Sequence, residues 1–176
     1  MKTILAIFIC LYTNIIWAQS PTTSPCDSRL LTQFDSIKEV YVSSVKDDIV
    51  IKKDEKNKLI LALLAMERTI ILSIIVVGGG DCIDETNKMN VVFRDGTKLE
   101  MLNNGGFNCD AEFSIFFGGD FGHKKELGLF LTNEIETIKI STRKSTIDKA
   151  RNNVVEVAVP PDTSKLIMES ITCLTN

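Results

Sequence analysis

Two long apolar runs separated by a charged pair constrain the fold of this chain more than any other feature of its sequence. The runs cover residues 59–66 and 69–77, and Glu67 and Arg68 lie between them. Together they approach the length of a transmembrane helix, but each charge at the centre of such a helix would cost about 2.5–3.5 kcal/mol. A hairpin of two buried strands accounts for both the length and the central charges. The second run, rich in isoleucine and valine, favours a strand, whereas the first, rich in leucine and alanine, fits either a strand or a helix.

Alternating apolar residues elsewhere predict that most of the chain is β-structure. The clearest example is Asp95-Gly96 between runs at 91–94 and 97–101, which predicts a hairpin with a tight type I′ turn. Asp47 and Asp48 mark a further turn. Other strand-like runs lie at 40–45, 49–51, 113–117, 135–142 and 155–159. We expect seven to nine strands joined mostly by hairpins, and the lack of strand–helix–strand alternation argues against a parallel sheet.

The end of the chain predicts a helix. Pro160 and Pro161 end the preceding strand, because proline cannot donate a hydrogen bond to a sheet, and Asp162 or Thr163 can cap the helix that follows. Its buried stripe would consist of Leu166, Ile167, Ile171 and Leu174. Residues 123–131 also carry an apolar face, but Gly128 weakens a helix there. The predicted fold is mainly β (α+β): an antiparallel, hairpin-rich sheet or a sandwich or barrel, closed by one C-terminal helix.

The start of the chain has the pattern of a secretory signal peptide. Lys2 supplies a positive charge, residues 4–16 are mostly apolar, and Ala18 is a small residue at a cleavage position. The apolar stretch is shorter than the roughly 20 residues of a spanning helix, which favours cleavage over an uncleaved anchor. The mature protein would be exported, to the periplasm or out of the cell, with no stable transmembrane segment. We expect a signal peptide at 1–18, a flexible leader at 19–28 and a single β-rich domain at 29–176.

The charge of the chain argues against nucleic-acid binding. The 176 residues include 20 Lys and Arg against 23 Asp and Glu, and cleavage would remove one basic residue, Lys2. A mildly acidic chain lacks the concentrated positive surface that contact with phosphates requires. The basic residues form two small groups, which we interpret as solvated charge, with contact to an anionic surface as an alternative for the second. The groups are Lys124-Lys125, and Arg143, Lys144, Lys149 and Arg151.

Four cysteines remain once Cys10 leaves with the signal peptide. An even number in an exported chain indicates two disulfides, and four cysteines allow three pairings. Cys26 and Cys173 lie near the two ends, whereas Cys82 and Cys109 lie in Gly- and Asn-rich loops. We therefore favour the nested pairing, Cys82–Cys109 within Cys26–Cys173. The spacing matches neither a zinc site nor a redox C-x-x-C motif, which favours structural disulfides over metal-binding or catalytic thiols.

His123 is the only histidine and the one candidate for a general base. Asp120 precedes it by three residues, so a small secreted hydrolase using His123 with an acidic partner or a serine is possible on sequence grounds. The sequence contains no Gly-x-Ser-x-Gly motif, and the glycine-rich residues 118–122 lack the Gly-Lys-Ser/Thr ending of a phosphate loop. A single histidine in such a loop is usually solvated. We assign no catalytic or cofactor-binding residue.

Acidic residues flank the two central cysteines. If Cys82 and Cys109 are bridged, these residues would gather around two loops, as a weak Ca²⁺ site or as a solvated acidic rim. They are Asp81, Asp84, Glu85 and Asp110. Their spacing differs from that of a calcium loop, which favours the rim, and we predict no metal site.

Several short motifs follow one another in a recognisable order. They are residues 81–84, 93–100, 108–110 and 135–142, followed by a final helix that ends in Cys173-Leu174. In this order, and in its Ala18–Gln19 junction, the chain resembles uncharacterised small exported proteins of the Bacteroidetes type. The resemblance implies export and a β-rich fold closed by a helix, and it implies no activity and no site.

The sequence leaves two functions open. The first is an exported, non-enzymatic domain that binds a protein or a small apolar ligand, or serves as a structural module of the cell envelope. The apolar residues 59–77 would then supply a surface or a pocket, although buried core strands account for them equally well. The second is a small secreted hydrolase using His123. The two differ in whether His123 lies in a cleft, within hydrogen-bond reach of Asp120 or a serine.

Overall fold

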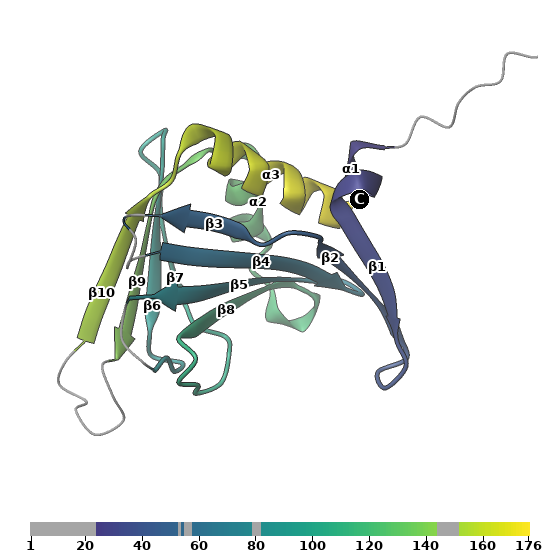
Figure 1. The fold of residues 1–176 in the computed structure, drawn as a ribbon, viewed down its shortest axis with the longest axis horizontal. Coiled ribbons are helices and arrows are strands. Elements are labelled where there is room, and N and C mark those ends of the chain that lie inside the picture. The colour runs from purple at the N-terminus through teal and green to yellow at the C-terminus, as the bar shows by residue number, and fades with distance from the viewer. Residues whose placement is uncertain (1–23, 53, 55–57, 79–81, 144–151) are drawn as a thin grey trace, which may run out of the picture.

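The computed structural model describes residues 24–52, 54, 58–78, 82–143 and 152–176, so the predicted signal peptide lies outside the described residues. Two antiparallel sheets and a C-terminal helix form the described part of the chain (Figure 1), which confirms the predicted fold class. The strands are β1 (Leu30–Asp35), β2 (Val40–Val45), β3 (Ile49–Lys52), β4 (Lys58–Met66), β5 (Thr69–Val77), β6 (Lys88–Phe93), β7 (Lys98–Leu102), β8 (Glu112–Gly118), β9 (Ile135–Arg143) and β10 (Asn152–Ala158). The helices are α1 (Pro25–Arg29), α2 (Lys124–Thr132) and α3 (Pro161–Thr175), with one 3-10 turn, η1 (Gly119–Phe121).

The larger sheet, sheet A, contains six strands in the order β1–β2–β4–β5–β8, with β3 also paired to β4. Strands β2 and β3 share one edge of β4, since β2 pairs with the end of β4 and β3 with its beginning. The interruption between them falls at residues 46–48, where Asp47-Asp48 predicted a turn. Sheet A therefore grows from a single long hairpin, β4–β5, to which the other strands add.

The β4–β5 hairpin confirms the interpretation of the two apolar runs, and the first of them is a strand. Met66 pairs with Thr69, so Glu67 and Arg68 alone form the turn and remain exposed to solvent. Glu67 has a φ of 54°, in the left-handed region that tight hairpin turns require. The charged pair thus lies where the chain reverses, in water and not in the core.

The smaller sheet, sheet B, has the order β10–β9–β6–β7. Its β6–β7 turn is not the predicted type I′ turn. Phe93 still bonds to Thr97, which leaves three residues for the turn, and the Gly96 N–H donates to the Phe93 carbonyl oxygen at 2.9 Å. Only Gly96 of these three has a positive φ (87°), whereas a type I′ turn needs two such residues. The connection is the three-residue kind, a turn followed by a left-handed glycine.

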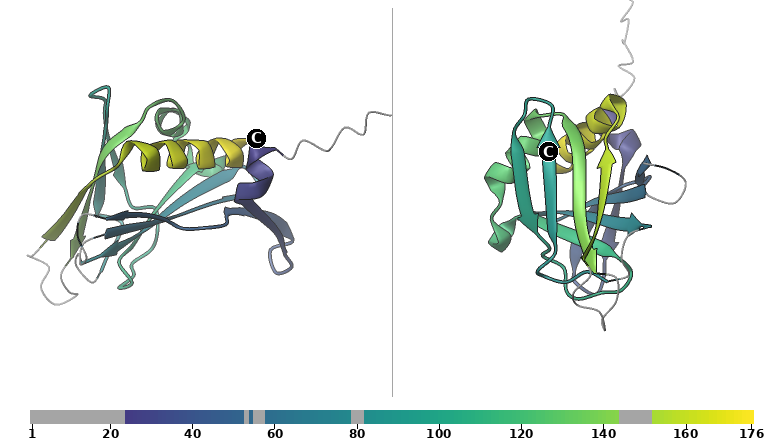
Figure 2. Two further views of the ribbon diagram at one scale, coloured as in Figure 1. Left: turned by 45° about the horizontal axis from the view of Figure 1, so that its top comes forward. Right: turned by 90° about the vertical axis from the view of Figure 1, so that its left-hand side faces the viewer.

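The core lies between the two sheets and under the helices. The strands of sheet B run across those of sheet A, with α3 along one side of the crossing and α2 beside it (Figure 2). Phe113, Ile115 and Phe117 alternate along β8 and are fully buried, as the sequence predicted. Ile167 and Ile171 of α3 join the same core. No helix among the described residues combines the length and the apolarity needed to cross a bilayer.

Both ends of the described domain differ from the sequence-based boundaries. Helix α3 begins at Pro161 with Pro160 as its N-cap, ahead of the predicted Asp162 or Thr163. Proline fits the first helical turn because the N–H that it lacks would have no partner there. The expected flexible leader runs to residue 28, whereas the structure forms α1 from Pro25, with a capping box between Ser24 and Asp27.

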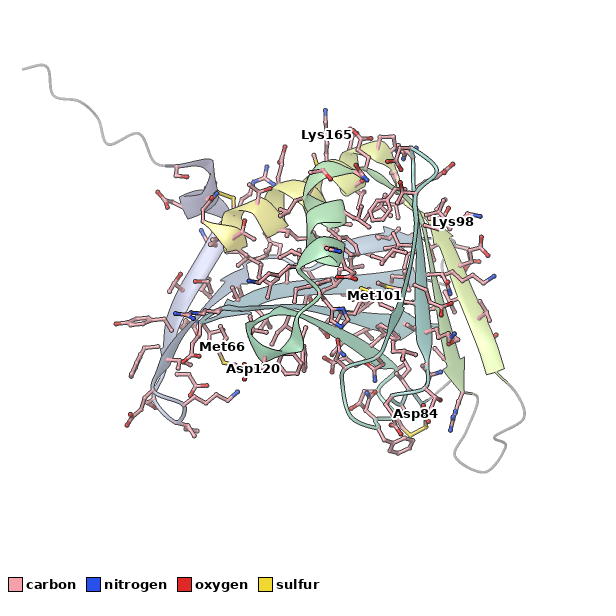
Figure 3. All side chains as sticks on the ribbon, turned by 180° about the vertical axis from the view of Figure 1, so that it is seen from behind. Met66, Asp84, Lys98, Met101, Asp120 and Lys165 are labelled. Atoms are coloured by element: carbon pink, nitrogen blue, oxygen red, sulfur yellow. A yellow bond between two sulfur atoms is a disulfide. The ribbon has the colours of Figure 1, made fainter. Side chains whose placement is uncertain are left out.

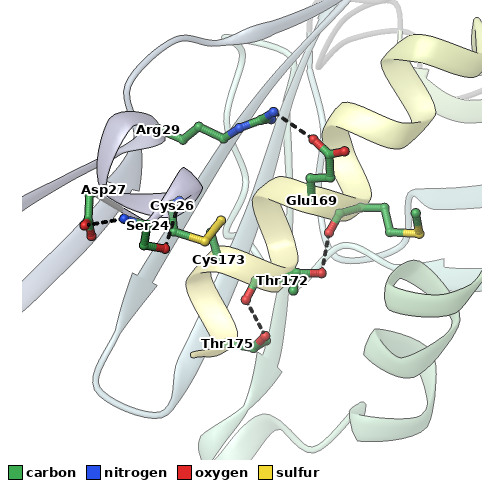
Figure 4. The surroundings of a disulfide bond; sticks show 9 residues. Ser24, Cys26, Asp27, Arg29, Glu169, Thr172, Cys173 and Thr175 are labelled. Atoms are coloured by element: carbon green, nitrogen blue, oxygen red, sulfur yellow. Dashed lines mark hydrogen bonds and ion pairs between the residues drawn. A yellow bond between two sulfur atoms is a disulfide. The ribbon is translucent and has the colours of Figure 1, made fainter. Parts of the chain in front are cut away.

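Both predicted disulfides are present. Cys26–Cys173 joins α1 to the end of α3 (Figure 4), and Cys82–Cys109 joins two loops near the start of β6 and β8. Arg29 and Glu169 form an ion pair of 2.7 Å beside the first bridge. The nested pairing is confirmed, and it ties the first described element to the last one. Stable disulfides of this kind are typical of chains that fold in an oxidising compartment.

Candidate binding surface

Sheet A presents two apolar faces, and only one of them belongs to the core. On the core face, alternate residues such as Leu61 and Ile74 are completely buried. The strand register places the residues between them on the opposite face, since Ile60 pairs with both Val50 and Ile75, and Ile71 pairs with both Leu64 and Phe116. We call this opposite side the outer face. Away from the ends of β4 and β5, its apolar residues are Val50, Ile60, Ala62, Leu64, Ile71, Ile75 and Phe116.

The outer face is accessible to solvent. Val50 and Ile75 are exposed, and the other five residues are half-buried. The helices lie against the core face, as the view from behind shows with α2 in front of the strands (Figure 3). A sheet with one face in water normally alternates between apolar and polar residues. Here the water-facing positions of β4 and β5 are mostly aliphatic, and an apolar surface of this kind usually marks an interaction site.

One polar cluster interrupts the outer face at its β8 side. Ser73 of β5 donates a hydrogen bond to the Glu112 carboxylate, and the Ser114 hydroxyl lies 3.5 Å from the same oxygen. Phe121 of η1 packs edge-on against Phe116, with ring centroids 4.8 Å apart. The apolar surface therefore continues from the strands onto η1, with the Glu112 cluster beside it.

The β1–β2 hairpin forms an arm that extends beyond the rest of sheet A (Figure 1). Its apolar side chains are unusually exposed: Ile37 at the turn is 93% exposed and Phe34 is 54% exposed. The rings of Phe34 and Tyr41 pack against each other across the arm, with centroids 5.2 Å apart. Leu31, also exposed, pairs with Ser44, which in turn pairs with Leu64, so it lies on the same side as the outer face.

The two edges of sheet A are treated differently. At the β8 edge, side-chain amide oxygens take the place of a neighbouring strand, because Asn103 accepts from the Ser114 N–H (2.8 Å) and Asn104 from the Phe116 N–H (3.0 Å). Asn108 does the same for Glu112. At the other edge, no side chain in the described part of the chain covers the outward N–H and C=O groups of Thr32 and Phe34 in β1. One edge of the sheet is closed and the other is open.

The structure places His123 apart from the partners that a hydrolase would need. His123 precedes α2 in a left-handed conformation (φ 56°), and its side chain is 37% exposed. The carboxylate within 4 Å of it, in the described residues, is Glu126 at 3.8 Å and not Asp120. His123 is also absent from the lining of the two depressions next to it. The arrangement does not supply the His–Asp or His–Ser contact that the hydrolase hypothesis requires.

The glycine-rich residues 118–122 form η1 and the wall of an open depression of about 720 Å³. Gly118 has a φ of 80°, and a Cβ atom there would lie 2.5 Å from the Arg68 carbonyl oxygen. The glycine is thus explained by its close approach to the β4–β5 turn. Arg68 and Lys124 line this depression together with Glu67 and Asp120, so the charges of the depression are mixed.

The predicted acidic rim is formed only in part. Asp84 is buried and pairs with Arg143 at 2.7 Å, and it also accepts hydrogen bonds from the main chain and hydroxyl of Thr86. Glu85 and Asp110 are exposed, and Asp81 lies outside the described residues. No group of three potential metal ligands occurs in the described part of the chain. Arg143, interpreted from the sequence as a solvated charge, is therefore a structural partner of Asp84, whereas Lys124 and Lys125 are exposed; residues 144–151 are outside the described residues.

Comparisons of the chain with protein-family models, with curated proteins and with solved structures find no match. The features that indicate a function are therefore those of the surface itself. The sequence contained the signal for the outer face, because Ile60, Leu64, Ile71 and Ile75 interrupt the apolar–polar alternation of a half-exposed hairpin. Core strands buried on both faces give the same pattern, and only the structure shows that one face is open.

Proposed function

We propose that this protein is an exported, non-enzymatic binding module of the cell envelope that holds a partner protein against the outer face of sheet A. The single observation that carries the proposal is the apolar, solvent-accessible outer face opposite the core. The signal-peptide pattern and the resemblance to small exported proteins support export, and the two disulfides are compatible with it.

The shape of the surface favours a protein over a small apolar ligand. Apolar ligands are usually held in enclosed cavities that cover most of their surface, whereas the outer face is an open sheet. Strands β4 and β5 have nine residues each, so the face is about 30 Å long, and four or five strands give it a width of about 20 Å. The resulting area of about 600 Å² is close to the roughly 800 Å² that each protein contributes to a standard interface.

The proposal is tested by placing charges on the outer face. Val50→Lys combined with Ile75→Lys changes two exposed residues, so the fold should persist while an apolar partner is repelled. Val154→Lys is the matched control, because Val154 is equally exposed but lies on β10 of sheet B.

Tagged mature protein is used to recover partners from its own envelope fraction. We expect one protein in fixed proportion with the wild type and with the control, and its loss with the double variant. Equal recovery by the double variant would show that binding uses another surface. Recovery of no protein, together with saturable uptake of a fluorescent fatty acid that the double variant abolishes, would replace the protein partner by an apolar ligand.

A further inference from the structure

The open edge of β1 is the feature of the fold that the proposed function leaves unused. The main-chain N–H of Lys46 donates to the Arg29 carbonyl oxygen (2.9 Å), next to the first residue pair of β1 and β2, which fixes the hydrogen-bonding phase of the two strands. In an antiparallel pair, alternate residues bond to the partner strand and the residues between them point away from it. Leu31 and Gln33 therefore bond to β2, and the main-chain groups of Leu30, Thr32 and Phe34 point outward.

Most of these outward groups have no partner. The Leu30 N–H donates to the Cys26 carbonyl oxygen and is satisfied. In the described part of the chain, the N–H and C=O of Thr32 and of Phe34 form no hydrogen bond. β1 is the outermost strand of the sheet (Figure 1). Exposed strand edges of this kind add a further strand from another chain unless charge, proline or cover prevents it.

We propose that β1 pairs with β1 of a second copy of this chain, in antiparallel orientation, to join two copies of sheet A into one continuous sheet. The phase of the open groups allows the register that we adopt, in which Thr32 lies opposite Thr32 of the second copy and Leu30 lies opposite Phe34; no other register with this phase overlaps a larger part of β1. The Thr32 N–H groups then bond to each other's carbonyl oxygens, and each Phe34 N–H bonds to the opposite Leu30 carbonyl oxygen.

The side chains in this register are complementary. Arg29, the last residue of α1, lies opposite Asp35 at the end of β1, once on each side of the two-fold axis, so that Asp35 adds a second carboxylate beside the Arg29–Glu169 ion pair. The exposed Phe34 ring packs beside Leu30 of the second copy, which removes apolar surface from water. No like charges face each other in the strand, because residues 30–34 are uncharged.

The pairing would also enlarge the surface described above. The two-fold axis stands perpendicular to the sheet, so both outer faces point to the same side, with Leu31 of each copy next to the junction. The self-association depends on the edge of β1 and not on the outer face. Its failure would therefore leave the proposed function untouched.

Substitution of Thr32 tests the inference, because its N–H points away from β2. Thr32→Pro removes that donor and blocks strand addition while the bonds from Leu31 and Gln33 to β2 remain, as proline is tolerated at sheet edges. Thr32→Ala is the matched control, since both variants lose the 2.9 Å contact between the Thr32 and Ser43 hydroxyls, but alanine keeps the N–H.

Sedimentation velocity of the mature protein, from micromolar to near-millimolar concentration, should show a monomer–dimer equilibrium for the wild type and for Thr32→Ala. Thr32→Pro should weaken association by at least about tenfold. Asp35→Asn, which keeps an oxygen for the turn N–H groups that Asp35 caps, should weaken it about three- to tenfold by removing the charge. A monomeric wild type over the whole range, or unchanged dimers with Thr32→Pro, would overturn the inference.

Amide hydrogen exchange of the wild type gives a measurement that does not depend on a variant. The Thr32 and Phe34 amides should exchange rapidly in dilute protein and slowly in concentrated protein, whereas Leu31 and Gln33 are protected in both. Rapid exchange of Thr32 and Phe34 in a sample that is dimeric would place the contact elsewhere and refute the β1 pairing.

Discussion

Neighbouring isoleucines on β5 allow the two faces of sheet A to be compared by the same substitution. Ile74 points into the core and is 0% exposed, whereas Ile75 belongs to the outer face and is 40% exposed. Alanine removes three carbon atoms in each case, worth about 2.4 kcal/mol if all were fully buried. At Ile74 a cavity adds to this loss, so Ile74→Ala should lower the free energy of unfolding by about 3–4 kcal/mol.

At Ile75 the expected loss is much smaller. Scaling the transfer free energy by the buried fraction gives about 1.4 kcal/mol, and no cavity forms because the vacated space opens to water. The two variants should therefore differ by about 2 kcal/mol although they are adjacent in sequence and share one strand.

Urea unfolding of the two purified variants, followed by circular dichroism with the disulfides intact, measures the difference. The slope of the free energy against urea should match that of the wild type, so that the midpoints report stability alone. A loss of 3 kcal/mol or so for Ile75→Ala as well would mean that the outer face is packed against something in the isolated protein. The outer face would then not be an open binding surface.

Three further comparisons test particular contacts by the same unfolding measurement. Replacing Cys26 and Cys173 by serine opens a loop with a sequence separation of 147 and should lower the free energy of unfolding by about 5 kcal/mol. The same change at Cys82 and Cys109, with a separation of 27, should lower it by about 3.5 kcal/mol. Equal losses would contradict an origin in the chain entropy of the unfolded state. Asp84→Ala leaves Arg143 without its buried partner and should lower the free energy of unfolding by about 3–5 kcal/mol. Glu100→Ala breaks the exposed pair with Lys88 and should lower it by less than about 1 kcal/mol. A small loss for Asp84→Ala would show that the pair with Arg143 is not structural. Gly118→Ala should destabilise the protein by about 1–3 kcal/mol because of the positive φ of Gly118 and the nearby Arg68 carbonyl oxygen. In α2, the Cβ atom of Gly128→Ala meets no atom within 4 Å, and this variant should be more stable than the wild type by about 0.5–1 kcal/mol. The opposite order of stabilities would refute the explanation given for Gly118.

The strands and disulfides could be predicted because their signals are local or countable. Alternation along 113–117 determines which side of β8 is buried, and the four cysteines that follow the predicted signal peptide allow only three pairings. The predictions that were wrong concern features that depend on which other residue a given residue contacts in the fold. Asp95-Gly96 suits a two-residue turn, but the pairing of Phe93 with Thr97 leaves three residues to turn. The structural role of Arg143 depends on Asp84, which is distant in sequence and adjacent only in the fold.

The outer face could not be predicted for a related reason. An aliphatic residue at Ile60 or Ile71 has the same chemistry whether a second layer covers it or water does, and periodicity reports that a face is apolar but not what covers it. The covering of the core face by α2 and α3 is a property of the tertiary structure, and it cannot be read from the sequence of either strand or helix alone.

Whether the edges of sheet A are open or covered determines whether its exposed apolar face leads to aggregation or to a specific contact. A sheet with a solvent-accessible aliphatic face and two free edges would be prone to uncontrolled aggregation. Here Asn103, Asn104 and Asn108 close the β8 edge with side-chain oxygens, so that of the two outermost strands, β1 and β8, only β1 keeps open main-chain groups in the described part of the chain. An edge that accepts one antiparallel copy is used up by that contact, which gives a closed two-fold assembly and not a growing one. With β1 paired as proposed, local hydrogen bonding would prevent growth of sheet A through β1 and β8, while the apolar outer face would remain available for a different partner.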